Sequence, residues 1–217
     1  MSWLRSLQYR VLALILALSA CSLASAQVEK YLNGTHYRLV PGVPAVPQWQ
    51  GSADKPNVTE IFWYGCPHCY EFDAVLAAWV ASHGDTINFS RSPMIWTPIS
   101  RQHARIYFVA QSLGLGSQLH KPIFDAIQLQ HNNLVNEGAA QLFFAGNGVA
   151  ADRFAVAWHS TAIDETMRTY EDAMKALHVP SVPALLVNGK YLVYVRETVP
   201  THAAMLEVAE FLLHKPG

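Results

Sequence analysis

Two cysteines separated by two residues are the most reactive feature of this 217-residue sequence. They lie in the tetrapeptide Cys66-Pro67-His68-Cys69, where a β-branched and aromatic segment gives way to a helical pattern. The first turn of a helix offers unpaired backbone N–H groups and partial positive charge, and both stabilise a thiolate at Cys66. Cys69 lies one turn further on, close enough to form a disulfide with Cys66 but shielded by the helix. The spacing therefore predicts a redox-active cysteine pair.

The two residues between the cysteines favour the same chemistry. His68 adds a hydrogen-bond donor or a positive charge near Cys66, which lowers the pKa of that thiol further. Pro67 loses no hydrogen bond near a helix start, and it stiffens the loop. Because the thiolate is stabilised, the reduced protein is favoured over the disulfide, which makes the disulfide a strong oxidant.

Other uses of a Cys-x-x-Cys pair fit the sequence less well. A zinc site needs a second such pair or a spaced pair of histidines, and the histidines of this chain, such as His131, are scattered singly. Covalent haem attachment needs a histidine at position 70, which is Tyr70. A structural disulfide across so short a loop stabilises little. We therefore expect thiol redox chemistry with no metal and no other cofactor, and metal binding is the main alternative.

The periodicity around the cysteines predicts a βαβ unit. Val58 to Tyr64 is a β-branched and aromatic run typical of a buried central strand. Apolar residues then recur at helical spacing after Cys66, until Gly84 ends the helix, and residues 87–90 form a second strand candidate. Further strands are predicted at residues 36–40, 184–187 and 191–195, with Asn188-Gly189 as a hairpin turn and a last helix capped by Thr201.

A helical block interrupts these strands. Helical segments are predicted around residues 101–113, 118–130, 137–145 (capped by Asn136), 151–159 and 160–177. The order of elements predicts an α/β fold in which residues 27–97 and 179–217 form a sheet domain and residues 98–178 form a helical insertion.

The first 26 residues have the pattern of a secretory signal peptide. Basic residues precede the apolar run Val11 to Leu18, which at eight residues is too short to span a membrane. Ala24-Ser25-Ala26 has the form of a cleavage site, and Leu18-Ser19-Ala20-Cys21 also resembles a bacterial lipobox that would leave Cys21 lipidated. We favour cleavage after Ala26 over lipidation, and either route predicts export to a bacterial periplasm.

Composition excludes several classes of protein. The chain is 51% hydrophobic and 14% charged, which excludes an intrinsically disordered protein. Its 15 basic and 16 acidic residues give a formal net charge of −1, so nothing indicates nucleic-acid binding.

Two segments together resemble the DsbA family of periplasmic thiol:disulfide oxidoreductases, a branch of the thioredoxin superfamily. They are residues 60–70 (EIFWYGCPHCY) and residues 182–191 (VPALLVNGKY), and the resemblance covers essentially the whole chain after residue 26. It implies a thioredoxin-like fold, in which helices flank a central mixed sheet, with an inserted helical domain. It also implies that Cys66 is the exposed nucleophile and Cys69 its buried partner.

The resemblance assigns further residues around the cysteines. An X-Pro bond at a turn is where cis peptides occur, although an ordinary trans proline at an edge strand is the alternative, and the resemblance implies that Pro183 is a cis-proline opposite the cysteines. Val182 would then offer its backbone to an extended substrate strand. Glu60 matches the family's buried acid beneath the disulfide, where it could tune the cysteines or relay protons. Its alternative is a strand-edge charge facing water, and Arg91 is the nearest candidate for its basic partner.

The function implied is a dithiol oxidase that transfers the Cys66–Cys69 disulfide to newly exported proteins with free thiols. A DsbB-type membrane quinone reductase would reoxidise it, and we expect a monomer with no nucleic-acid partner. The first alternative is a disulfide isomerase or reductase, whose usual dimerisation domain we do not find in the sequence. The second is a metal-binding module built on Cys66, Cys69 and a histidine.

Overall fold

The computed structural model describes residues 29–40, 42, 46–50 and 55–215. Tyr31–Gly217 forms one compact unit, and Met1–Lys30 is a separate one of which only Glu29 and Lys30 are described. The predicted signal segment, including Cys21, therefore lies outside the described residues. Among the residues that are described, no helix is both long and apolar enough to cross a membrane.

Five strands form one mixed sheet in the order β1-β5-β4-β2-β3. Their bounds are β1 (Arg38–Leu39), β2 (Asn57–Phe62), β3 (Asn88–Pro93), β4 (Ala184–Val187) and β5 (Tyr191–Tyr194). Strand β2 runs parallel to β3 and antiparallel to β4, and every one of its residues is buried, as its β-branched and aromatic composition predicts. It ends earlier than predicted because residues 63–65 turn out of the sheet toward the next helix.

The βαβ unit predicted around the cysteines is confirmed. Helix α2 (Pro67–His83) begins directly after Cys66 and ends at Gly84, whose φ of 51° suits a residue without a Cβ. After the short 3-10 helix η3 (Gly84–Thr86), the chain enters β3 parallel to β2. The hairpin between β4 and β5 also forms as predicted, and Asn188 and Gly189 both have the positive φ of its tight turn.

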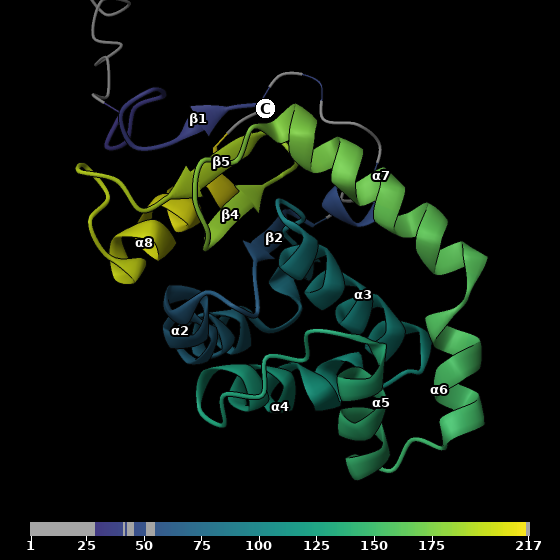
Figure 1. Ribbon diagram of the computed structural model, residues 1–217. Coiled ribbons are helices and arrows are strands. Elements are labelled where there is room, and N and C mark those ends of the chain that lie inside the picture. The colour runs from purple at the N-terminus through teal and green to yellow at the C-terminus, as the bar shows by residue number, and fades with distance from the viewer. Residues whose placement is uncertain (1–28, 41, 43–45, 51–54, 216–217) are drawn as a thin grey trace, which may run out of the picture. The chain divides into compact units, whose positions relative to one another are not determined.

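Five helices lie between β3 and β4 in the chain, close to the predicted segments. They are α3 (Pro98–Ser112), α4 (Gly116–Gln128), α5 (Glu137–Gly146), α6 (Ala151–Trp158) and α7 (Thr161–Leu177). The Asn136 side chain caps α5 as predicted, by accepting a hydrogen bond from the Ala139 N–H. Figure 1 shows α3–α6 gathered beside the sheet, with α7 leading back toward it. The domain limits at residues 98 and 178 stay a prediction.

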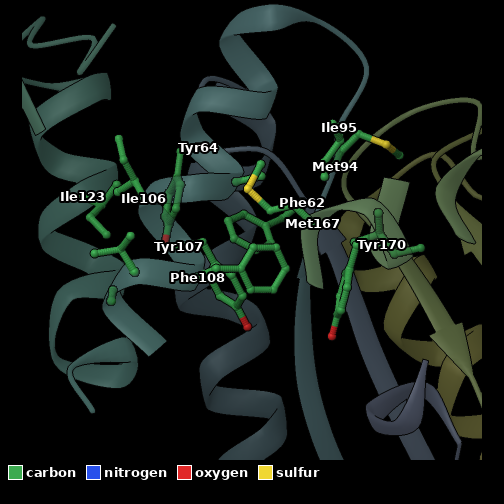
Figure 2. Packing of buried hydrophobic residues seen from close by; sticks show 14 of the residues in the cluster. Phe62, Tyr64, Met94, Ile95, Ile106, Tyr107, Phe108, Ile123, Met167 and Tyr170 are labelled. Atoms are coloured by element: carbon green, nitrogen blue, oxygen red, sulfur yellow. The ribbon is translucent and has the colours of Figure 1, made fainter. Parts of the chain in front are cut away.

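Two clusters of buried side chains hold β2 and α2, between which the cysteine motif begins. In the first, the centroid of the Phe62 ring lies 4.9 Å from that of Tyr64 and 5.7 Å from that of Tyr107 (Figure 2). The centroid of the Phe124 ring lies 5.8 Å away, so β2 is joined to both α3 and α4. In the second, α2 and α8 (His202–Leu213) pack with β4 and β5. Helix α8 starts at Thr201, whose hydroxyl caps it as predicted.

Candidate active site

The two cysteines occupy different environments at the start of α2. Cys66 is the N-cap residue, and Pro67 is at the first position of the helix. Cys66 is 9% exposed and Cys69 is fully buried, and both are thiols. Cys66 is thus less exposed than the resemblance implied, because the carbonyl oxygen of Val182 lies 3.5 Å from its Sγ.

The pKa values of the two thiols are shifted in opposite directions. The pKa of Cys66 is lowered to about 6, first by a hydrogen bond from the Cys69 thiol, and then by the backbone of Cys69 and His68 and by the charge of His68. The Cys66 sulfur makes no capping hydrogen bond of ordinary length, so the backbone groups act from further away. Burial raises the pKa of Cys69, and the neighbouring Cys66 and Glu60 raise it further. At neutral pH, Cys66 is therefore the thiolate and Cys69 the thiol.

The ring of His68 is exposed and contacts Glu71. Its side chain is 74% exposed, and its Nδ1 lies 3.3 Å from an oxygen of Glu71. Its charge is the last of the causes that lower the pKa of Cys66, after its own backbone. Of the two contributions predicted for the ring, the structure supports the charge rather than a hydrogen bond.

The loop before β4 lies opposite the cysteine turn because β4 pairs with β2. The Val182–Pro183 peptide bond is cis, as the resemblance implies. A groove of about 480 Å³ starts at His68, passes Val182 and Pro183, and reaches the segment before α8. It is lined by His68, Ser181, Val182, Pro183, Val195, Pro200, Thr201 and His202. Val182, whose carbonyl oxygen lies 3.5 Å from the Cys66 sulfur, thus also lines this groove.

A buried charged network lies behind the cysteines. Glu60 is fully buried, and its Oε2 accepts a 2.9 Å hydrogen bond from Nε of Arg91, the residue opposite it on β3. This agrees with the prediction that Glu60 is buried and that Arg91 is its partner. Another nitrogen of Arg91 donates to Asp73 at 2.9 Å. Burial outweighs the attraction of Arg91 and raises the pKa of Glu60 to about 7, so its carboxyl titrates near neutral pH.

Two members of this network were not found from the sequence. Asp73 lies four residues after Cys69 on α2, a spacing that could have indicated it. His120 comes from α4, and it links the hydroxyl of Tyr64 (3.0 Å) to Asp73 (3.3 Å). Nothing in the local pattern around His120 predicts this contact.

The network also contains potential metal ligands. In the part of the chain that the structure describes, the single cluster of three such residues comprises Glu60, Asp73 and His120, with ligand atoms within 4.8 Å of one another. The guanidinium of Arg91 already contacts both carboxylates, so it supplies the positive charge that a metal ion would bring. Neither cysteine belongs to this cluster, so it is not the cysteine–histidine module considered above.

The fold and the site together define a class of protein. A Cys-x-x-Cys pair at the start of the helix after a central strand, with a cis-proline facing it, is the site of a thioredoxin-like thiol:disulfide oxidoreductase.

Comparison with known proteins agrees with this class. No protein-family profile matches the chain. The thiol:disulfide interchange protein DsbA of Pseudomonas aeruginosa is 31% identical over 182 residues, 83% of this chain and 84% of the relative. DsbA of Burkholderia cepacia is 32% identical over 172 residues, 79% of this chain and 80% of the relative.

Solved structures give the same result. The crystal structure of Pseudomonas aeruginosa DsbA matches with a TM-score of 0.76 at 29% identity, over 86% of this chain and 94% of that one. Xylella fastidiosa DsbA matches with a TM-score of 0.75 at 28% identity, over 84% and 96%. The chain belongs to the DsbA family of thiol:disulfide oxidoreductases, and it has the thioredoxin-like fold with a helical insertion that the sequence predicted.

Proposed function

We propose that this protein is a dithiol oxidase that donates the Cys66–Cys69 disulfide to folding proteins. The observation that carries the proposal is the place of Cys66 at the N-cap of α2, one turn from the Cys69 thiol, where the pKa of Cys66 is lowered to about 6. A stabilised thiolate favours the reduced form of the pair, so the disulfide readily accepts two electrons. A reductase or isomerase, the alternative, would need the disulfide to be the favoured form or would have to be held reduced.

The transfer proceeds by two exchanges. A substrate thiolate attacks the Cys66 sulfur, the Cys66–Cys69 bond breaks, and Cys69 leaves as a thiolate that takes up a proton. A second substrate thiolate then attacks the substrate sulfur of the mixed disulfide, and Cys66 leaves as a thiolate. The substrate has lost two electrons and gained a disulfide, and the protein holds two reduced cysteines. The opposed pKa shifts suit the two leaving groups: Cys66 departs as the stable thiolate, and Cys69 ends as the thiol.

Five neighbours of the cysteines have supporting roles. Val182 and Pro183 bind the substrate backbone, because the Val182 carbonyl and the adjoining groove lie beside Cys66. Glu60 exchanges the proton of Cys69, since its carboxyl titrates near neutral pH and its charge acts on that thiol. Pro67 and His68 complete the helix start that stabilises the Cys66 thiolate.

The redox potential against glutathione tests the direction of transfer. An oxidase should equilibrate at a potential more oxidising than the roughly −180 mV of protein disulfide isomerase, and the oxidised protein should form a disulfide in a reduced, unfolded two-cysteine protein. A potential near the about −270 mV of thioredoxin would support the reductase instead.

The setting follows from the signal pattern in residues 1–26 and from family membership. We propose that the protein works in the periplasm as a monomer on exported proteins with free thiols, and that a DsbB-type membrane quinone reductase reoxidises it. Membrane vesicles containing such a reductase should reoxidise the reduced protein in the presence of quinone, and vesicles without it should not. The intact mass of the exported protein decides between a free chain beginning at Gln27 and a lipidated chain beginning at Cys21.

A further inference from the structure

Trp63 contacts the cysteine turn through its backbone. It lies between β2 and α2, and its carbonyl oxygen accepts a 2.9 Å hydrogen bond from the N–H of Cys66. Its backbone also acts on the Cys69 thiol, where it opposes the rise of the pKa that burial causes. The position of Trp63 therefore affects how readily the buried Cys69 becomes a thiolate.

The indole ring of Trp63 is fixed against the same turn. It packs so closely on Gly65 that a Cβ there would lie 2.3–2.9 Å from three ring carbons. Gly65 is thus required for space, since any larger residue would push the ring away. The ring also stacks on His103 of α3, with centroids 6.1 Å apart, and its Nε1 donates a 3.0 Å hydrogen bond to Nδ1 of His103.

His103 is held in one protonation state by its two partners. An indole N–H can only donate, so Nδ1 of His103 must be unprotonated. The other ring nitrogen, Nε2, lies 2.9 Å from the carbonyl oxygen of Asn133, which can only accept, so Nε2 carries the hydrogen. The residue is 2% exposed, and burial lowers its pKa, which keeps the ring neutral. A helix of the insertion thus provides a fixed acceptor for the active-site tryptophan.

We propose that His103 is a positioning residue for the Cys69 thiol, acting through Trp63. By anchoring the indole it holds in place the turn whose Trp63 carbonyl accepts from the N–H of Cys66, directly before the helix turn that carries both cysteines. The step affected is ring closure, in which the Cys69 thiolate attacks the Cys66 sulfur of a mixed disulfide. The Cys66–Cys69 bond forms, the bond to the partner breaks, the partner leaves as a thiolate, and the proton of Cys69 is lost. The proposal deepens the proposed function, because it concerns the same cysteine pair.

The test separates the two exchange steps. Reduced, full-length exported protein is mixed with oxidised glutathione, and acid-quenched samples are analysed by mass spectrometry. The appearance of glutathionylated protein reports attack by Cys66, and its decay to the intramolecular disulfide reports closure by Cys69. We expect His103→Leu to slow closure roughly threefold to tenfold, the range for losing one neutral hydrogen bond, with the Cys66 attack changed far less.

Matched variants identify the route. His103→Asn places an amide oxygen where Nδ1 of His103 accepts the hydrogen bond from the indole N–H. Closure in this variant should therefore be as fast as in the unsubstituted protein. Trp63→Phe keeps an aromatic ring but no N–H, so it should slow closure like His103→Leu, and the double variant should be no slower. Unchanged closure in folded His103→Leu and Trp63→Phe proteins would overturn the proposal, as would equal slowing of both steps. The assay measures closure whatever the redox potential is, so the oxidase proposal can fail separately.

Discussion

The lowered pKa of Cys66 predicts that the reduced protein gains stability over the oxidised protein as pH rises. In the reduced form the folded pKa is about 6, and an unfolded thiol has a pKa of about 8.5. A group whose folded pKa is depressed contributes stability above its unfolded pKa, and that contribution is lost as pH falls through the folded value. In the oxidised form the same sulfur cannot ionise, so the difference between the two forms isolates this effect.

The size of the effect follows from linkage. The contribution of Cys66 to the unfolding free energy is close to zero at pH 5, about 1.4 kcal/mol at pH 7 and about 2.5 kcal/mol at pH 8. Cys69 changes little over this range, because neither its folded thiol nor most of its unfolded thiol ionises below pH 8. Glu60 titrates in both forms, so most of its contribution cancels.

Urea unfolding of both redox forms between pH 5 and pH 8 measures this difference. The free energy of unfolding of the reduced protein, minus that of the oxidised protein, should rise by about 2.5 kcal/mol from pH 5 to pH 8. This corresponds to a shift of roughly 5–10 °C in the difference between their melting temperatures. The matched control is Cys69→Ala, which removes the largest cause of the Cys66 shift and should move the thiolate absorbance titration of Cys66 to higher pH. A difference that stays flat from pH 5 to pH 8 would refute the reasoning.

Three further substitutions test individual contacts. His68→Ala should raise the pKa of Cys66 by less than about one unit, because the His68 ring is mostly exposed and water screens its charge; a larger rise in an alkylation-rate titration would contradict this. Pro183→Thr should keep the fold but slow product release, so that mixed disulfides with substrates accumulate on non-reducing gels, and their absence would count against the substrate-binding role. Gly65→Ala should destabilise the protein by about 1–3 kcal/mol in urea unfolding, because its Cβ displaces the Trp63 ring; a value near zero would mean that the ring is not fixed there.

Local patterns were sufficient for the elements and for the cysteine pair. The strand and helix positions followed from periodicity, and the hairpin followed from Asn188-Gly189. The lowered pKa of Cys66 was predicted from its place before a helix, since backbone N–H groups and helix charge depend only on local chain direction. Its largest cause, the hydrogen bond from the Cys69 thiol, was not predicted. These features need no knowledge of distant contacts.

The contacts behind the cysteines depend on the tertiary structure, although Glu60 and its candidate partner Arg91 were already named from the resemblance. Glu60 and Arg91 are neighbours because β2 and β3 pair in one particular register, which neither strand specifies alone. His103 and His120 come from α3 and α4, and their contacts with Trp63 and Asp73 depend on how those helices pack on the turn. In the sequence each histidine is one of several polar residues in an amphipathic helix, and nothing distinguishes it from the others.

The pKa values of the two thiols are shifted in opposite directions although the cysteines lie only three residues apart, and the reason is geometric. Cys66 precedes the helix and faces backbone N–H groups and the Cys69 thiol, all of which stabilise negative charge. Cys69 is one turn further in, fully buried, and the carboxyl of Glu60 adds a negative charge to its surroundings. Arg91 compensates that carboxyl only in part, so Glu60 can still take up a proton near neutral pH. The same buried carboxyl that adds to the effect of burial on Cys69 is the group that we propose accepts its proton when the disulfide forms again.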